Sequence, residues 1–176
     1  MATIIQFDGT DGTGKTYLST LLYEHLKEQG IKVLYQHYPG EQIKFRIVNR
    51  LYPDNFFKDL ECIWEIYSTR KNFYWQYDYV IEDRGYLSTL VYGDKASEEM
   101  VKGLIRQHES NTVLVYLDYI YDEGKEENHL DVHKYEYRTK YRKYIDELVG
   151  YKKIIKIEEP VDFEILFKTL YINGVI

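Results

Sequence analysis

The sequence predicts an α/β fold in which one parallel sheet lies between two layers of helices. Two observations predict this fold: short apolar runs without polar alternation recur along the chain, and segments with helical periodicity separate them. A strand that is apolar on both faces is buried on both faces, which is typical of a parallel sheet covered by helices. With 176 residues, 44% of them hydrophobic, the chain has the length of one domain and can bury a sizeable core.

The apolar runs and the helical segments alternate from the first residues to the last. The expected strands cover residues 3–7, 31–38, 77–83, 112–119 and 152–158. The expected helices cover residues 15–29, 41–51, 54–75, 96–108, 132–149 and 161–171. In the first helix Leu18, Leu22 and Leu26 share one face, and Gly30 follows at the position where a helix commonly ends. The run 112–119 is nearly all apolar, which predicts a central strand.

Composition excludes several classes of protein. The formal net charge is −6, so the chain lacks the basic surface that sequence-independent binding to nucleic acid requires. The single cysteine, Cys62, cannot form an internal disulfide, and no cysteine–histidine cluster suggests zinc. No apolar run approaches the roughly 20 residues that span a bilayer, and the first residues lack the pattern of a signal peptide. We expect a soluble, cytoplasmic protein of one domain, residues 1–176.

The stretch FDGTDGTGKT, residues 7–16, predicts a phosphate-binding loop. Gly9, Gly14, Lys15 and Thr16 fit the pattern G-x-x-x-x-G-K-[ST], and the loop stands between an expected strand and an expected helix. Glycines let backbone N–H groups surround phosphate oxygens, and the start of the helix favours an anion. The sequence therefore predicts that the chain binds ATP with Mg²⁺, Lys15 reaching the β- and γ-phosphates and Thr16 serving as a metal ligand. The residues expected to contact the ATP phosphates are Gly9, Thr10, Asp11, Gly12, Thr13, Gly14, Lys15, Thr16 and Tyr17.

A second informative stretch, YVIEDRGYLSTLVYG, covers residues 79–93. The expected strand ends there at Asp83 and Arg84. Ligands gather at the carboxyl ends of the strands of a parallel sheet, so these residues should share an edge with the phosphate loop. Asp83 can hold a metal-bound water or orient an attacking oxygen, and Arg84 can bind a second phosphate with its fork of donors.

With these two stretches the chain resembles the thymidylate kinases, a family of nucleoside monophosphate kinases with a phosphate loop. Three patterns carry the resemblance: F-x-G-x-D-x-x-G-K-[ST], D-R-Y-x-x-S-x-x-A-Y and, on the helix before the third strand, F-x-A-x-R. This chain matches them at Phe7, Gly9, Asp11, Gly14, Lys15, Thr16, Arg70, Asp83, Arg84, Ser88 and Tyr92. Gly85, Val91 and Ile66 depart from the second and third patterns. We therefore expect a three-layer fold with a five-stranded parallel sheet in the order 2-3-1-4-5.

The resemblance implies phosphoryl transfer from ATP to a deoxynucleoside monophosphate, with dTMP as the expected acceptor. It implies that Asp11 contacts the 3′-hydroxyl of the acceptor, that Arg84 holds the acceptor phosphate and that Arg70 holds its base or phosphate. It implies that Tyr92 lies against the deoxyribose, and that Lys15, Asp83 and Arg84 carry the catalysis, with Thr16 and Asp83 at the metal. The resemblance also raises the expectation of a homodimer. The full set of expected acceptor contacts is Asp11, Tyr38, Lys44, Ile66, Arg70, Arg84, Ser88 and Tyr92.

Two other departures bear on the site. The family usually carries an arginine after its second strand, where this chain has His37 and Tyr38, so Lys44 or Arg46 on the next helix could supply the charge. The phosphate loop contains no arginine, and the expected lid, residues 121–133, is short. The basic residues that could stabilise the transferred phosphoryl group are Lys125 in this lid and Arg138 or Arg142 on the helix after it.

Two alternatives remain open from the sequence. The chain could be a deoxynucleoside kinase that phosphorylates the 5′-hydroxyl of a nucleoside, with Glu41 as its base, although Asp11 argues against this. It could also be a nucleotide-binding protein without catalysis that acts as a sensor, although Lys15, Thr16, Asp83 and Arg84 are all present. Base preference and oligomeric state do not follow from the sequence.

Overall fold

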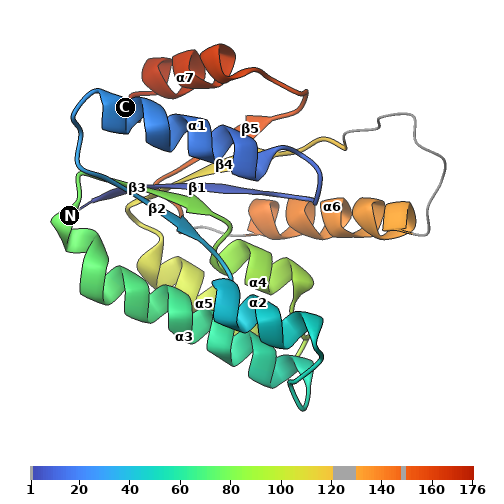
Figure 1. Ribbon diagram of the computed structural model, residues 1–176. Coiled ribbons are helices and arrows are strands. Elements are labelled where there is room, and N and C mark those ends of the chain that lie inside the picture. The colour runs from blue at the N-terminus through green and yellow to red at the C-terminus, as the bar shows by residue number, and fades with distance from the viewer. Residues whose placement is uncertain (1, 121–129, 148–149) are drawn as a thin grey trace.

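The computed structural model describes residues 2–120, 130–147 and 150–176, and its centre is a parallel sheet (Figure 1). The strands are β1 (Thr3–Gly9), β2 (Val33–His37), β3 (Tyr79–Asp83), β4 (Thr112–Leu117) and β5 (Lys153–Ile157). They pair in the order β2-β3-β1-β4-β5, every pair parallel, which confirms the predicted topology. All carboxyl ends therefore meet at one edge, where β1 leads into the phosphate loop and β3 ends at Asp83.

Helices cover both faces of the sheet, as the apolar strands require. One face carries α1 (Lys15–Glu28) and α7 (Phe163–Ile172), at the top of Figure 1. The other face carries α3 (Asn55–Phe73), α4 (Tyr86–Tyr92), α5 (Glu98–His108) and α6 (Leu130–Glu147), and the short α2 (Glu41–Val48) packs beside α3. In the part of the chain that the structure describes, no helix is both long enough and apolar enough to pass through a bilayer.

Each face of the sheet has its own hydrophobic core. Under α1 and α7, the strand residues Ile5 and Val115 pack against leucines of both helices. On the opposite face, Leu114 and Tyr116 pack against α3, α4, α5 and α6. Successive residues of β4 point to opposite faces, so a strand that serves two cores must be apolar on both, as this one is from Val113 to Leu117.

The structure differs from the expected elements in a few places. The helix α4 is not predicted from the sequence, because four of its seven residues are buried apolar ones (Tyr86, Leu87, Leu90 and Val91), which leaves no polar face to give a helical period. The expected helix 54–75 ends at Phe73 and continues as a 3₁₀ turn, Tyr74–Gln76. The expected helix 41–51 ends at Val48. Of the expected lid, residues 121–129 lie outside the described residues, and 130–133 belong to α6.

Candidate functional site

The phosphate loop runs from the end of β1 to the start of α1, and hydrogen bonds within the domain fix its shape. Gly9, Gly12 and Gly14 have positive φ angles of 146°, 81° and 79°, which glycine adopts at little cost. Gly9 also lies close to β4: a Cβ atom there would come 2.6 Å from the Leu117 carbonyl oxygen. The Thr13 hydroxyl donates to the Thr10 carbonyl over 2.9 Å, so the loop closes on itself. Contacts within the chain thus define the shape of the loop.

Lys15 is a buried cation at the base of this loop. Its side chain is only 5% exposed, and its Nζ donates to the Thr10 carbonyl over 2.5 Å. Burial and the positive charge of Arg84 lower the pKa of Lys15 to about 8. Burial of the positive charge of Lys15 is unfavourable, and an anionic ligand bound beside it would compensate this charge. Tyr17, by contrast, is exposed on the first turn of α1.

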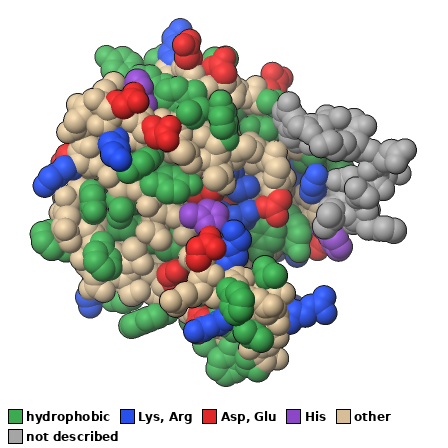
Figure 2. Space-filling model, viewed as in Figure 1, with side chains coloured by type: hydrophobic (Ala, Val, Ile, Leu, Met, Phe, Trp, Pro, Cys, Tyr) green, Lys and Arg blue, Asp and Glu red, His purple; other side chains and the backbone are tan. Residues whose placement is uncertain are grey.

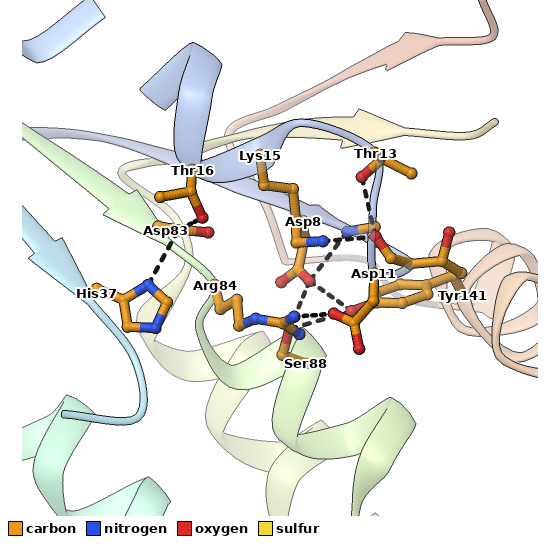
Figure 3. Close-up of polar contacts among 12 residues, drawn as sticks. Asp8, Asp11, Thr13, Lys15, Thr16, His37, Asp83, Arg84, Ser88 and Tyr141 are labelled. Carbon is orange, nitrogen blue, oxygen red and sulfur yellow. Dashed lines mark hydrogen bonds and ion pairs between the residues drawn. The ribbon is translucent and has the colours of Figure 1, made fainter. Parts of the chain in front are cut away.

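Asp83 and Thr16 meet at the carboxyl ends of the strands (Figure 3). The Thr16 hydroxyl donates to Asp83 Oδ2 over 2.5 Å, and His37 Nδ1 lies 2.9 Å from the same oxygen. Burial raises the pKa of Asp83, but the contacts with His37 and Thr16 outweigh it, and the pKa lies below the usual range. Asp83 Oδ1 is buried and has no hydrogen-bond partner among the described residues. A carboxylate and a hydroxyl supply the hard oxygen ligands that Mg²⁺ prefers, and the open Oδ1 fits such an ion.

Arg84 connects this edge of the sheet to the phosphate loop. Its guanidinium pairs with the Asp11 carboxylate and lies over the Tyr92 ring, 5.4 Å from the centroid. Its backbone N–H donates to the Phe7 carbonyl over 2.9 Å and holds the residue at φ 74°. Such a conformation costs a residue with a Cβ about 1–2 kcal/mol. The fold maintains this strained backbone conformation at Arg84, whose side chain turns toward the phosphate loop.

Asp8, one residue before the first glycine, is a site residue that the sequence analysis missed. It is fully buried between Lys15 and Arg84, and its Oδ1 accepts hydrogen bonds of 2.6 Å each from Ser88 and Tyr141 (Figure 3). Burial raises the pKa of Asp8. The carboxylate joins β1, α4 and α6 directly below the phosphate loop. A motif search does not find it, because its partners lie 80 and 133 residues away along the chain.

A cavity of about 250 Å³ lies beside the phosphate loop, between α2, α3 and α4. Acidic, basic and histidine side chains gather in the recess on this face of the molecule (Figure 2). The cavity is lined by Asp11, Tyr38, Pro39, Ile47, Lys58, Asp59, Cys62, Ile66, Arg84, Gly85, Ser88, Thr89 and Tyr92. Of the predicted acceptor contacts, the structure brings six to this cavity: Asp11, Tyr38, Ile66, Arg84, Ser88 and Tyr92.

Two predicted acceptor contacts lie elsewhere. Arg70 Nε and Nη2 donate to both oxygens of Glu82, over 2.9 and 2.6 Å, and Nη1 lies 3.0 Å from Glu109. Arg70 therefore neutralises buried carboxylates and borders a different cavity in this structure, and its contact with the acceptor stays a prediction. Lys44 is an exposed residue of α2, 3.7 Å from Glu41, and does not line the cavity beside the phosphate loop.

The structure does not place the described cations that were predicted to serve the lid beside the phosphate loop. Lys125 lies outside the described residues. Arg138 Nε donates to Asp118 Oδ1 over 2.9 Å, and its Nη2 donates to the Asp118 carbonyl over 2.6 Å. Arg142 and Lys156 also pair with the buried Asp118 carboxylate, at the end of β4. Arg138 is thus bound to an acid of its own domain in this structure, rather than turned toward the phosphate loop.

Comparisons with known proteins agree with the architecture. No family model and no curated protein matches the sequence. The solved structure of thymidylate kinase from Ehrlichia chaffeensis is similar over 99% of this chain and 98% of that chain, with a TM-score of 0.64 and 24% sequence identity. At this identity the similarity shows the fold, which is that of a thymidylate kinase-like protein.

Proposed function

We propose that this protein transfers the γ-phosphoryl group of ATP to a deoxynucleoside monophosphate, with dTMP as the preferred acceptor. One observation carries the proposal: the Arg84–Asp11 pair joins the phosphate loop to the adjoining cavity. A donor nucleotide on the loop and an acceptor in the cavity would therefore share one wall. The thymidylate kinase-like fold and the resemblance of the two motifs support the same assignment.

The described side chains can perform this transfer by positioning and charge stabilisation. The loop amides and Lys15 would hold the β- and γ-phosphates, and Arg84 would hold the acceptor phosphate. Thr16 and Asp83 would hold Mg²⁺, which when bound neutralises charge on the donor phosphates. An oxygen of the acceptor phosphate attacks the γ-phosphorus, the bond from that phosphorus to the β–γ bridging oxygen breaks, and ADP leaves with the electron pair. The acceptor is itself the nucleophile, so the protein needs none of its own.

The sugar-facing part of the cavity favours a deoxyribose. Asp11 lies at the cavity wall with its carboxylate paired to Arg84, where it can accept a hydrogen bond from the 3′-hydroxyl. The Tyr92 ring lies under the same guanidinium and occupies the space next to it. A carboxylate on one side and an aromatic ring on the other would bind a deoxyribose and crowd a 2′-hydroxyl.

The position of Glu41 gives no support to the deoxynucleoside kinase alternative. Glu41 is 88% exposed, pairs with Lys44 on α2 and does not line the acceptor cavity. A general base must lie within hydrogen-bond reach of the hydroxyl that it deprotonates. The monophosphate therefore remains the better acceptor, because Arg84 supplies a phosphate ligand in the cavity.

The test is Mg²⁺-dependent ADP formation from ATP with dTMP, dUMP, dCMP, dGMP, dAMP, thymidine and deoxycytidine as separate acceptors. The expected result is turnover of monophosphates with dTMP fastest, and its loss in Lys15→Met. Turnover of nucleosides alone would overturn the proposal in favour of the deoxynucleoside kinase. Tight ATP binding without turnover of any acceptor would favour a nucleotide sensor.

A further inference from the structure

Two charged side chains of α3, Lys58 and Asp59, line the acceptor cavity and have no role in the proposed phosphoryl transfer. Lys58 Nζ donates to the Tyr92 carbonyl over 3.3 Å and lies 3.4 Å from Asp59 Oδ1. Asp59 is only 1% exposed. A buried carboxylate that borders a ligand cavity needs an explanation beyond packing.

The two oxygens of Asp59 have different surroundings. Oδ2 accepts a hydrogen bond of 2.6 Å from the Asp94 N–H and one of 2.7 Å from the Ser97 hydroxyl, which fixes the orientation of the carboxylate. Oδ1 is buried and accepts no hydrogen bond from a described residue. Oδ1 is thus a fixed, buried acceptor that no hydrogen bond occupies, 3.4 Å from the ammonium group of Lys58.

Asp59 contacts the chain at the end of α4 that lies opposite to Arg84. Arg84 directly precedes α4, and Asp59 binds the backbone directly after that helix, at Asp94. The seven residues of α4 rise about 10 Å at 1.5 Å each. An extended nucleoside monophosphate spans a similar length between its phosphate and the far edge of its base, so a nucleotide whose phosphate binds Arg84 would bring its base to Lys58 and Asp59.

Some other polar groups near the cavity are already engaged, whereas the hydroxyl of Tyr92, which also lines it, accepts and donates no hydrogen bond among the described residues. The Tyr38 hydroxyl is paired with the Tyr74 hydroxyl over 2.8 Å, and the Ser88 hydroxyl donates to Asp8. Arg70 is bound by Glu82 and Glu109. With Asp11 and Arg84 assigned to the sugar and the phosphate, Lys58 and Asp59 are the charged residues of the described lining that remain for a base.

We infer that Lys58 and Asp59 recognise the imide edge of a pyrimidine, thymine or uracil, an inference that rests on the proposed function. Lys58 would donate to a ring carbonyl and Asp59 Oδ1 would accept from N3–H. An imide N–H has a carbonyl on each side, so this edge fits whichever side Lys58 occupies. Cytosine has the donor N4 where thymine has the acceptor O4, and the acceptor N3 where thymine has the donor N3–H. The lone pair of cytosine N3 would therefore face the carboxylate of Asp59.

The sharpest test is Asp59→Asn. The amide oxygen must stay with the two donors that hold Oδ2, so the amide nitrogen would occupy the position of Oδ1 and turn the open acceptor into a donor. The ratio of kcat/KM for dCMP to kcat/KM for dTMP should then rise about a hundredfold. This ratio does not depend on the fraction of folded enzyme. Lys58→Met, which keeps the acceptor, should lower kcat/KM for dTMP and dUMP alike by about tenfold.

Glu61→Gln is the matched control, because it makes the same change of charge on the same helix at a residue outside the cavity that pairs with Arg46. It should leave the acceptor ratio unchanged. An unchanged ratio in Asp59→Asn, with dTMP turnover retained, would overturn the inference and leave the proposed function intact.

Calorimetric binding of dTMP and dCMP separates the remaining cases. Binding that shifts from dTMP to dCMP in Asp59→Asn, in an enzyme without turnover, would support base recognition and overturn the proposed function. If neither nucleotide binds the wild-type protein, both are overturned.

Discussion

Replacing Arg70 by methionine tests whether this arginine stabilises the fold or binds the acceptor. Its side chain is 10% exposed and neutralises Glu82 and Glu109, both fully buried. Removing one partner of a buried ion pair costs about 3–5 kcal/mol, because the remaining charge has no compensation. For a chain of this length each kcal/mol lowers Tm by about 2–4 °C, so Arg70→Met should lower Tm by about 6–20 °C at pH 7.

The stability that Arg70→Met loses should depend on pH in a direction that follows from the buried carboxyl groups. Burial already raises the pKa of Glu109, against the opposing charge of Arg70, and without the arginine the pKa of this carboxyl would rise further in the folded state. The folded state then binds more protons than the unfolded state, so the variant should regain stability relative to the wild type as the pH falls from 8 to 5.

Circular dichroism melts of the wild type, Arg70→Met and Lys71→Met measure this effect. Lys71, the next residue on α3, is exposed, and its replacement should leave Tm within about 2 °C. An Arg70→Met variant with unchanged Tm and an acceptor KM raised tenfold or more would refute this explanation. Arg70 would then bind the acceptor after all.

Three further predictions concern the phosphate loop and its edge of the sheet. Gly9→Ala should prevent stable folding, because its Cβ would meet the Leu117 carbonyl oxygen at 2.6 Å. Gly12→Ala, in open space at φ 81°, should lower the free energy of unfolding by only about 1–2 kcal/mol in denaturant melts. Equal losses of stability in the two variants would contradict the contact between Gly9 and Leu117. With the pKa of Lys15 at about 8, ATP affinity measured by calorimetry should be about twofold weaker at pH 8 and about tenfold weaker at pH 9 than at pH 7, and Lys15→Met should lack this slope. Asp83→Asn should raise the Mg²⁺ concentration for half-maximal rate at least tenfold, and an unchanged Mg²⁺ titration would exclude Asp83 from the metal site.

The sequence predicts the sheet well because its signals are local. Strands that are apolar on both faces, each followed by a helix, indicate the parallel sheet without knowledge of distant contacts. The phosphate loop is equally local: Gly9, Gly14, Lys15 and Thr16 stand within eight residues of one another. The placement of Asp83 and Arg84 beside this loop follows from the rule that parallel strands end at a common edge.

What the sequence does not predict depends on pairing between distant segments. Arg70 matches a family pattern, but its partners Glu82 and Glu109 lie on β3 and after α5, and only the packing of α3 shows that they neutralise it. Arg138 is diverted from the phosphate loop by Asp118 in the same way. Asp59 lacks a motif, and its open oxygen becomes visible only when the contacts of both oxygens are known.

The most direct test of the central claim follows the phosphorus atoms themselves. Phosphorus NMR of the wild-type protein with ATP, Mg²⁺ and dTMP distinguishes transfer to the acceptor from hydrolysis and from binding alone. The proposed function predicts that dTDP and ADP appear in equal amounts and that Lys15→Met forms neither. Release of inorganic phosphate in place of dTDP, or an unchanged spectrum with ATP bound, would contradict it.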